Sequence, residues 1–132
     1  MPLGKTVREV MHLALVTCDV NTPLQEAGSL ILRYDPHAVI VVDEAGEACG
    51  MFTATDLVRI FDRELTGLSV EAAMSTPVVS ISPFATLAEA AETMLEKGVH
   101  QLVVMHGAPP TERRPVGLVT RLLIVKHMLG AA

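Results

Sequence analysis

The chain has 132 residues, half of them hydrophobic, so it is long and apolar enough to build a core without disulfides or metal ions. Its net charge of −5 is modest and its basic residues are scattered, which argues against binding to nucleic acid or to a membrane surface. No apolar run approaches the roughly 18 residues that span a bilayer, and the N-terminus lacks a signal-peptide pattern, so we expect a cytoplasmic protein.

The hydrophobic pattern of the first half of the chain predicts five elements. They are a strand at residues 15–20, a helix at 24–34, strands at 38–42 and 49–53, and a helix at 55–63. Pro36 ends the first helix, because proline disfavours helical backbone in the residue before it. The helix side chains expected to face the core are Leu24, Ala27, Leu30, Ile31, Leu57, Ile60 and Phe61.

The second half of the chain predicts the same elements in the same order. They are a strand at residues 78–82, a helix at 83–97, strands at 102–105 and 116–120, and a helix at 122–129. Gly98 suits the C-terminal end of the long helix, where glycine adopts the left-handed conformation readily. The predicted buried stripe of this helix consists of Leu87, Ala90, Ala91, Met94 and Leu95.

These two halves form an internal repeat. Residues 7–41 align with residues 70–104 at an offset of 63, without gaps. Four extra residues then enter the second copy in the loop 108–115, after which Gly50 aligns with Gly117 at an offset of 67. Neither half alone would bury both faces of a three-stranded sheet, so we expect the halves to pack against each other about a pseudo-twofold axis. The predicted fold class is mixed α/β (α+β), with a β-α-β-β-α order in each repeat.

The turn from strand to helix differs between the two copies. The first copy closes it with Thr53, Thr55 and Asp56, whereas the second has Leu122 and Leu123 at the last two of these positions. Threonine and aspartate before a helix are common N-terminal caps. The first turn therefore predicts a capped helix, and its polar side chains are also candidates for contact with a ligand.

Two cysteines, Cys18 and Cys49, lie in apolar surroundings and lack Cys-x-x-Cys spacing. We interpret them as buried structural thiols, because free cysteine is among the most frequently buried residue types. A disulfide or a reactive thiol is the alternative interpretation.

The ordered motifs closely resemble a tandem pair of cystathionine-β-synthase (CBS) domains, called a Bateman module, over residues 7–129. The resemblance rests on the Val-x-x-x-Met opening of each copy, on the apolar strand 99–104, and on the strand-to-helix motif 50–56. It implies one repeat at residues 7–64 and another at 70–129, which together form one module.

This resemblance implies a regulatory module that binds an adenosine nucleotide, AMP, ADP or ATP, in a cleft between the repeats and signals to a partner protein. It also implies a flat homodimer. S-adenosylmethionine is an alternative ligand, and a structural dimerisation module with a vestigial pocket is an alternative function. We predict no enzyme and no required cofactor, because the sequence has no nucleophile–base motif, metal-ligand spacing or glycine-rich phosphate loop.

The family's binding residues transfer to positions on two walls of the expected cleft. A carboxylate such as Asp56 accepts two hydrogen bonds from a ribose diol, and a helix N-terminus donates backbone N–H groups to phosphate. Arg59 is an expected phosphate partner, and His37 and His100 occupy the position of a phosphate-contacting histidine. The full predicted set is Thr53, Thr55, Asp56, Arg59 and His37, with Ser75, Thr76, Pro77, Val78 and Val79 opposite, and Val99 and His100 beneath the base.

The second copy lacks the polar side chains that such a ligand requires. Leu123 stands where the ribose aspartate would be, and Leu122 replaces the hydroxyl of Thr55. Desolvating unpaired hydroxyls costs about 1 to 3 kcal/mol each, which an apolar side chain does not offset. We therefore predict one competent site, the one containing Asp56, and a second site that is empty or binds something less polar.

Overall fold

A computed structural model of the chain describes residues 4–34, 36, 38–106 and 113–130. It contains two three-stranded sheets, with strand orders β1-β2-β3 and β4-β5-β6. The strands are β1 (Val16–Asp19), β2 (Val39–Val42), β3 (Ala48–Phe52), β4 (Ser80–Ile81), β5 (Gln101–His106) and β6 (Arg114–Thr120). The helices are α1 (Val7–Val10), α2 (Leu24–Tyr34), α3 (Ala54–Val58), α4 (Leu87–Lys97) and α5 (Arg121–Met128). The mixed fold class predicted from the sequence is confirmed.

The structure divides into two compact units that differ from the sequence repeats. One unit is Leu15–Val78, and the other joins the N-terminal segment up to Ala14 to the chain from Val79 onward. Each unit therefore takes the short segment that precedes the first strand of the other repeat. No helix of the described residues is long and apolar enough to cross a bilayer.

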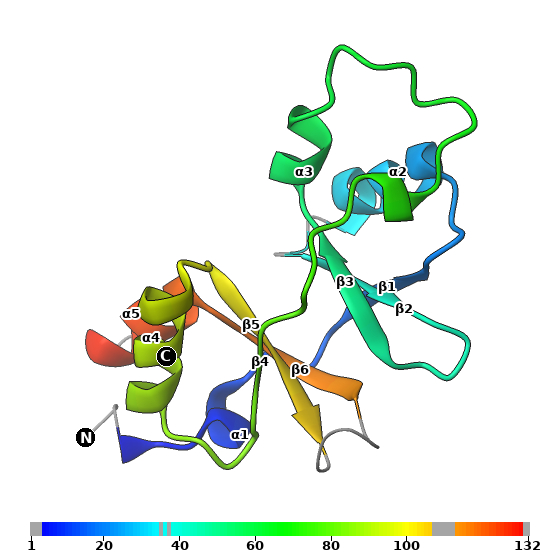
Figure 1. The fold of residues 1–132 in the computed structure, drawn as a ribbon. Helices are drawn as coiled ribbons and strands as arrows, with labels where there is room; N and C mark the ends of the chain where they lie inside the picture. The colour runs from blue at the N-terminus through cyan, green and yellow to red at the C-terminus, as the bar shows by residue number, and fades with distance from the viewer. Residues whose placement is uncertain (1–3, 35, 37, 107–112, 131–132) are drawn as a thin grey trace. The chain divides into compact units, whose positions relative to one another are not determined.

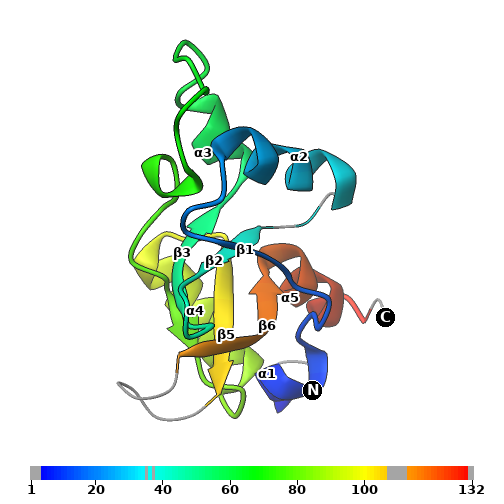
Figure 2. The same cartoon turned by 90° about the vertical axis from the view of Figure 1, so that its right-hand side faces the viewer.

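In the Leu15–Val78 unit, β1 and β2 are parallel and β2 and β3 are antiparallel. The parallel pair requires a crossover, which α2 supplies, because parallel strands cannot be joined by a tight turn. Figures 1 and 2 show α2 and α3 on the same side of this sheet. The helices and strands enclose a core of fully buried side chains: Leu24, Ala27, Val39, Val41, Phe52 and Val70.

The other unit repeats this plan. Here β4 and β5 are parallel, β5 and β6 are antiparallel, and α4 supplies the crossover. Figure 1 shows α4 and α5 together on one side of the sheet. The β-α-β-β-α order predicted for each repeat is therefore confirmed. The core of this second unit includes Val7 from the N-terminal segment, together with Leu87, Ala90, Met94, Leu102, Val104, Val119, Leu123 and Ile124.

The long helix of the second repeat begins at Leu87, so the start predicted at residue 83 is wrong. Thr86 is its N-cap: the Thr86 hydroxyl accepts a hydrogen bond from the Glu89 N–H at 3.1 Å. The Glu89 carboxylate accepts one from the Thr86 N–H at 3.4 Å, which completes a capping box. The predicted C-terminal end is confirmed, since Gly98 has a φ of 65° in the left-handed region.

Two side chains predicted to face the core lie on the surface instead. They are Phe61 and Leu95, each 84% exposed. Leu32, which is not among the predicted core residues, is 88% exposed. The prediction for Phe61 fails because α3 ends at Val58, so Phe61 lies beyond the regular helix. Leu95 lies on α4 but outside its buried stripe. These side chains therefore form apolar surface outside the core of their own unit.

The glycine that opens each strand-to-helix motif packs closely against a methionine side chain. A Cβ atom at Gly50 would overlap the side chain of Met74, and one at Gly117 would overlap that of Met11. Met11 and Met74 are the methionines of the two Val-x-x-x-Met motifs. In each unit, the Val-x-x-x-Met motif thus contacts the strand-to-helix motif. This contact holds the segment that follows the methionine against β3 in one unit and against β6 in the other.

Both cysteines are free thiols, half-buried, and packed against the core of the Leu15–Val78 unit. Cys18 lies on β1 and Cys49 on β3, on either side of the central strand β2. The interpretation as structural thiols thus holds in part, since each is packed but retains some exposure. Burial raises the pKa of the Cys18 thiol and that of the Cys49 thiol.

We expect the free energy of unfolding to fall as pH rises through the thiol range. The pKa of each thiol is higher in the folded chain, so above about pH 8.5 the unfolded chain loses these protons first. The thiol contribution is therefore complete below that pH and is lost above it. Urea unfolding at about pH 7 and about pH 9.5 measures the slope, which should be smaller in a Cys18→Ala/Cys49→Ala variant. An identical slope in both proteins would contradict the assignment.

Candidate functional site

The candidate site lies at the turn from β3 to α3. Thr53 is the N-cap of α3, and its hydroxyl accepts a hydrogen bond from the Asp56 N–H at 3.4 Å. In return, Asp56 Oδ2 accepts one from the Thr53 N–H at 2.9 Å, so the two residues form a capping box. The prediction that these residues cap a helix is confirmed. The cap also fixes the position of the Asp56 carboxylate.

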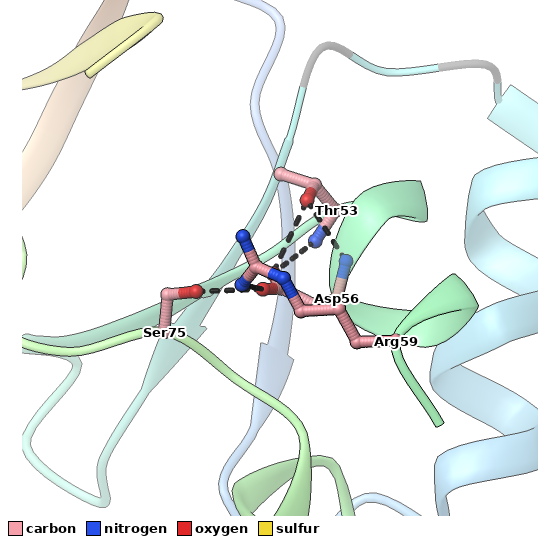
Figure 3. A network of polar contacts seen from close by, with 4 residues as sticks. All are labelled: Thr53, Asp56, Arg59 and Ser75. Carbon is pink, nitrogen blue, oxygen red and sulfur yellow. Dashed lines mark hydrogen bonds and ion pairs between the residues drawn. The ribbon is translucent and has the colours of Figure 1, made fainter. Parts of the chain in front are cut away.

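The Asp56 side chain is only 4% exposed and is the one buried charged side chain among the described residues. A buried carboxylate is unfavourable unless hydrogen-bond donors surround it. Besides the Thr53 N–H, Oδ2 accepts the Thr53 hydroxyl at 3.2 Å. Oδ1 accepts the Ser75 hydroxyl at 2.6 Å and the Arg59 guanidinium Nη1 at 3.3 Å. Figure 3 shows the three side chains converging on this carboxylate.

Ser75 reaches Asp56 because its backbone pairs with β3. The Met51 N–H donates to the Ser75 carbonyl at 3.0 Å, and the Ser75 N–H donates to the Met51 carbonyl at 2.7 Å. The close contact of Met74 with Gly50 holds the same segment in place. The sequence predicts Ser75 on the wall facing Asp56, and the structure brings the two side chains into direct contact.

The other predicted site residues of this unit lie on α3 and on the segment that follows Ser75, and they differ in exposure. Thr55 is exposed on the first turn of α3, and the Arg59 side chain is 68% exposed while its guanidinium contacts Asp56. Thr76 and Pro77 continue the Ser75 segment and are exposed, whereas Val78 is buried. The structure thus brings Thr53, Arg59 and Ser75 together around Asp56. The ligand contacts of all these residues stay predictions.

Val99 and His100 belong to the other compact unit. Both line a groove beside α4 and α5, and the His100 carbonyl accepts a hydrogen bond from the Arg121 N–H at 3.1 Å. Their part in a site with Asp56 therefore stays a prediction. His37 lies outside the described residues, as does most of the loop 108–115.

The equivalent turn of the other unit is apolar where the first is charged. Thr120 caps α5, accepting a hydrogen bond from the Leu123 N–H at 3.2 Å. Leu123 has no group that could reciprocate, and its side chain, 9% exposed, joins the hydrophobic core. His12 pairs with Leu118 through two backbone hydrogen bonds, as Ser75 does with Met51. The backbone arrangement is thus repeated while the carboxylate is absent from this turn.

The sequence model of the CBS domain matches this chain twice, at residues 7–63 and at residues 70–130. The chain belongs to the CBS domain family. The two matches cover nearly all of its length, so the chain is a pair of CBS domains. The resemblance identified from the sequence motifs is confirmed.

Curated relatives of this CBS pair are longer proteins. Uncharacterized protein MJ1404 of Methanocaldococcus jannaschii is 26% identical over 137 residues, which covers 92% of this chain and 31% of the relative. The L-aspartate semialdehyde sulfurtransferase of Methanosarcina acetivorans is 28% identical over 114 residues, which covers 86% of this chain and 22% of the relative. The chain thus spans less than a third of the length of either protein.

Several solved CBS structures share the fold. The CBS domain pair of protein MJ0100, in complex with 5′-methylthioadenosine and S-adenosyl-L-methionine, has a TM-score of 0.83 and 21% identity, covering 96% of this chain and 97% of that one. The CBS domain of a bacterial CNNM/CorC family Mg²⁺ transporter, in complex with ATP, has a TM-score of 0.82 and 20% identity, covering 99% and 92%. At these identities the similarity establishes the fold alone.

Proposed function

We propose that this CBS pair is a regulatory sensor that binds an adenosine ligand at Asp56 and passes the bound state to a partner protein. The observation that carries the proposal is the Asp56 carboxylate, which is buried and held in place by the capping box with Thr53. A carboxylate fixed in this way is suited to accept hydrogen bonds from the two hydroxyls of a ribose.

The ligands of similar structures support the choice of an adenosine group. The MJ0100 pair was solved with 5′-methylthioadenosine and S-adenosyl-L-methionine, and the transporter domain with ATP. These molecules share adenosine and differ in what is attached to its 5′ position. We therefore assign the shared ribose to Asp56, and the apolar segment around Val78 to the base. The activity named for the sulfurtransferase relative is not proposed for this chain, which spans 22% of that protein.

Arg59 offers a way to distinguish nucleotides from S-adenosylmethionine. Its side chain is 68% exposed, so the guanidinium is free to turn from Asp56 toward a phosphate. The Arg59→Gln substitution should therefore weaken the binding of ligands that carry a phosphate. S-adenosylmethionine and 5′-methylthioadenosine carry no phosphate, so the same substitution should leave their affinity nearly unchanged.

A thermal-shift screen tests the proposed function. Purified protein is heated with AMP, ADP, ATP, S-adenosylmethionine and 5′-methylthioadenosine, with GMP as a base control and 2′-deoxy-AMP as a ribose control. A ligand at a hundred times its dissociation constant adds about 2.7 kcal/mol to the stability, which raises the melting temperature by several degrees. We expect a rise with at least one adenosine ligand and a smaller one with each control. No rise with any ligand would favour the alternative, a structural dimerisation module with a vestigial pocket.

We also propose that the chain forms a homodimer through its exposed helix surfaces. One apolar groove lies along α2 and α3, and another lies along α4 and α5. Leu32 and Leu95 occupy equivalent positions of the repeat, each line one of the grooves, and are 88% and 84% exposed. Exposed apolar surface of this kind is typical of protein–protein contacts.

Phe61→Glu is expected to weaken this dimer about tenfold or more, because the substitution places an unpaired charge in an apolar contact. Phe61 lines the α2–α3 groove and is 84% exposed, so the change should leave the monomer fold intact. Sedimentation over a concentration series measures the dissociation constant. Phe84→Glu is a matched control, since Phe84 is 64% exposed and does not line either groove. A monomeric wild type, or equal effects of both substitutions, would contradict the proposal.

A further inference from the structure

Donors from the protein itself occupy the full hydrogen-bond capacity of the Asp56 carboxylate. Each carboxylate oxygen accepts about two hydrogen bonds. Oδ2 accepts from the Thr53 N–H and hydroxyl, and Oδ1 accepts from the Ser75 hydroxyl and the Arg59 guanidinium. The two ribose hydroxyls that bind this carboxylate must therefore displace two of these four donors.

The four donors are not equally easy to displace. The two from Thr53 belong to the capping box, so their loss would loosen the start of α3. The Arg59 contact is 3.3 Å long and comes from a side chain that is 68% exposed, so it is weak and readily exchanged. The Ser75 contact, at 2.6 Å, is the shortest hydrogen bond to this carboxylate, and it comes from outside the cap.

We propose that the Ser75 hydroxyl competes with the ligand for Asp56 Oδ1, so that ligand binding releases the Ser75 side chain from the carboxylate. The inference rests on the proposed adenosine site at Asp56. Ser75 thereby acts as a positioning residue that sets the affinity of the site, although it lies outside the strand-to-helix motif. At Oδ1, the ribose hydrogen bond then contributes to the binding free energy only by its difference from the serine hydrogen bond that it replaces. This exchange lowers the affinity of the site.

The position of Ser75 in the chain gives this exchange a route to the rest of the protein. Ser75 lies in the segment that ends at Val78, where the Leu15–Val78 unit passes into the other unit. Release of the side chain removes one restraint on this connecting segment, while the backbone pairing of Ser75 with Met51 is retained. The aligned position of the other repeat is His12, whose turn has Leu123 in place of the carboxylate. The same exchange is therefore absent at that turn.

Titration calorimetry of Ser75→Ala tests the competition, with AMP as one probe and S-adenosylmethionine as the other. Removing the serine hydroxyl frees one acceptor position, so the affinity for the probe that binds should rise about tenfold, as expected for a hydrogen bond to a charged group. Ser75→Thr keeps a hydroxyl and should stay within about twofold of wild type. A role confined to stability would leave the affinity unchanged. Unchanged or weaker binding in Ser75→Ala overturns the inference while the proposed function stands.

Amide hydrogen exchange without ligand separates the two proposals. In Ser75→Ala, we expect faster exchange than in wild type at the amides of Met51 and residue 75, which pair the segment with β3, because loss of the side-chain restraint lets this pairing open more often. Unchanged exchange there overturns the restraint, whatever the binding result. If neither wild type nor Ser75→Ala binds either probe, the proposed function fails and this inference fails with it.

Discussion

Asp56→Asn is expected to lower the affinity for an adenosine ligand about 100-fold. Asparagine keeps the size of the side chain and one acceptor oxygen, but it loses the charge and presents an NH₂ group in place of the second oxygen. A hydrogen bond to a charged group contributes about 1.5 to 3 kcal/mol, and about 2.7 kcal/mol corresponds to 100-fold in the dissociation constant. Calorimetric titration of both proteins with the same ligand measures the change.

This substitution also weakens the capping box, so two matched controls are needed. Glu89→Gln makes the equivalent change in the capping box of α4, away from the candidate site, and controls for the loss of a cap. Leu123→Met makes a volume-conserving change at the aligned position of the apolar turn. Both should bind the ligand as wild type does. Equal affinity in wild type and Asp56→Asn would remove Asp56 from the site.

Phe52→Ala is expected to lower the free energy of unfolding by about 3 to 5 kcal/mol, the largest stability change of those considered. Phe52 is fully buried at the end of β3, where it pairs with Val39 and packs in the core of the Leu15–Val78 unit. For a chain of 132 residues the melting temperature should fall by about 10 to 20 °C. Calorimetry or thermal circular dichroism measures the midpoint.

Phe84→Ala is the control for this change, since it removes the same side chain from a position that is 64% exposed. Substitutions at such positions usually change stability by less than about 0.5 kcal/mol. A similar fall in both variants would mean that Phe52 does not occupy the core position described here. The comparison also bears on the site, because Phe52 directly precedes the Thr53 cap.

Most of the fold follows from local sequence signals. The limits of α2 agree with the prediction of residues 24–34, because a clear helical stripe ends just before Pro36. The start of α4 differs from the predicted residue 83, which is a proline and therefore of a type common in a first helical turn. A stronger signal was present in Thr86-Leu-Ala-Glu89, which has the Thr-x-x-Glu spacing of a capping box.

The surface and the site are less accessible to prediction. Phe61 and Leu95 are apolar and spaced like core residues, and such spacing does not distinguish a core from a surface that another chain covers. The cap formed by Thr53 and Asp56 is local and was predictable. The Ser75 contact depends on pairing between residues far apart in the chain. No local sequence pattern could therefore show that the Ser75 hydroxyl donates a hydrogen bond to the Asp56 carboxylate.

The number of adenosine ligands bound per chain tests the central claim most directly. Equilibrium dialysis of the wild-type protein with radiolabelled ligand, chosen from the thermal-shift screen, gives this number at saturation. We predict one molecule per chain, because the β3–α3 turn carries Asp56 and the equivalent turn carries Leu123. At the ligand concentration that just saturates wild type, Asp56→Asn should reduce the bound amount, and Leu123→Met should not. Two molecules per chain, or one that persists unchanged in Asp56→Asn, would contradict the assignment of a single site at Asp56.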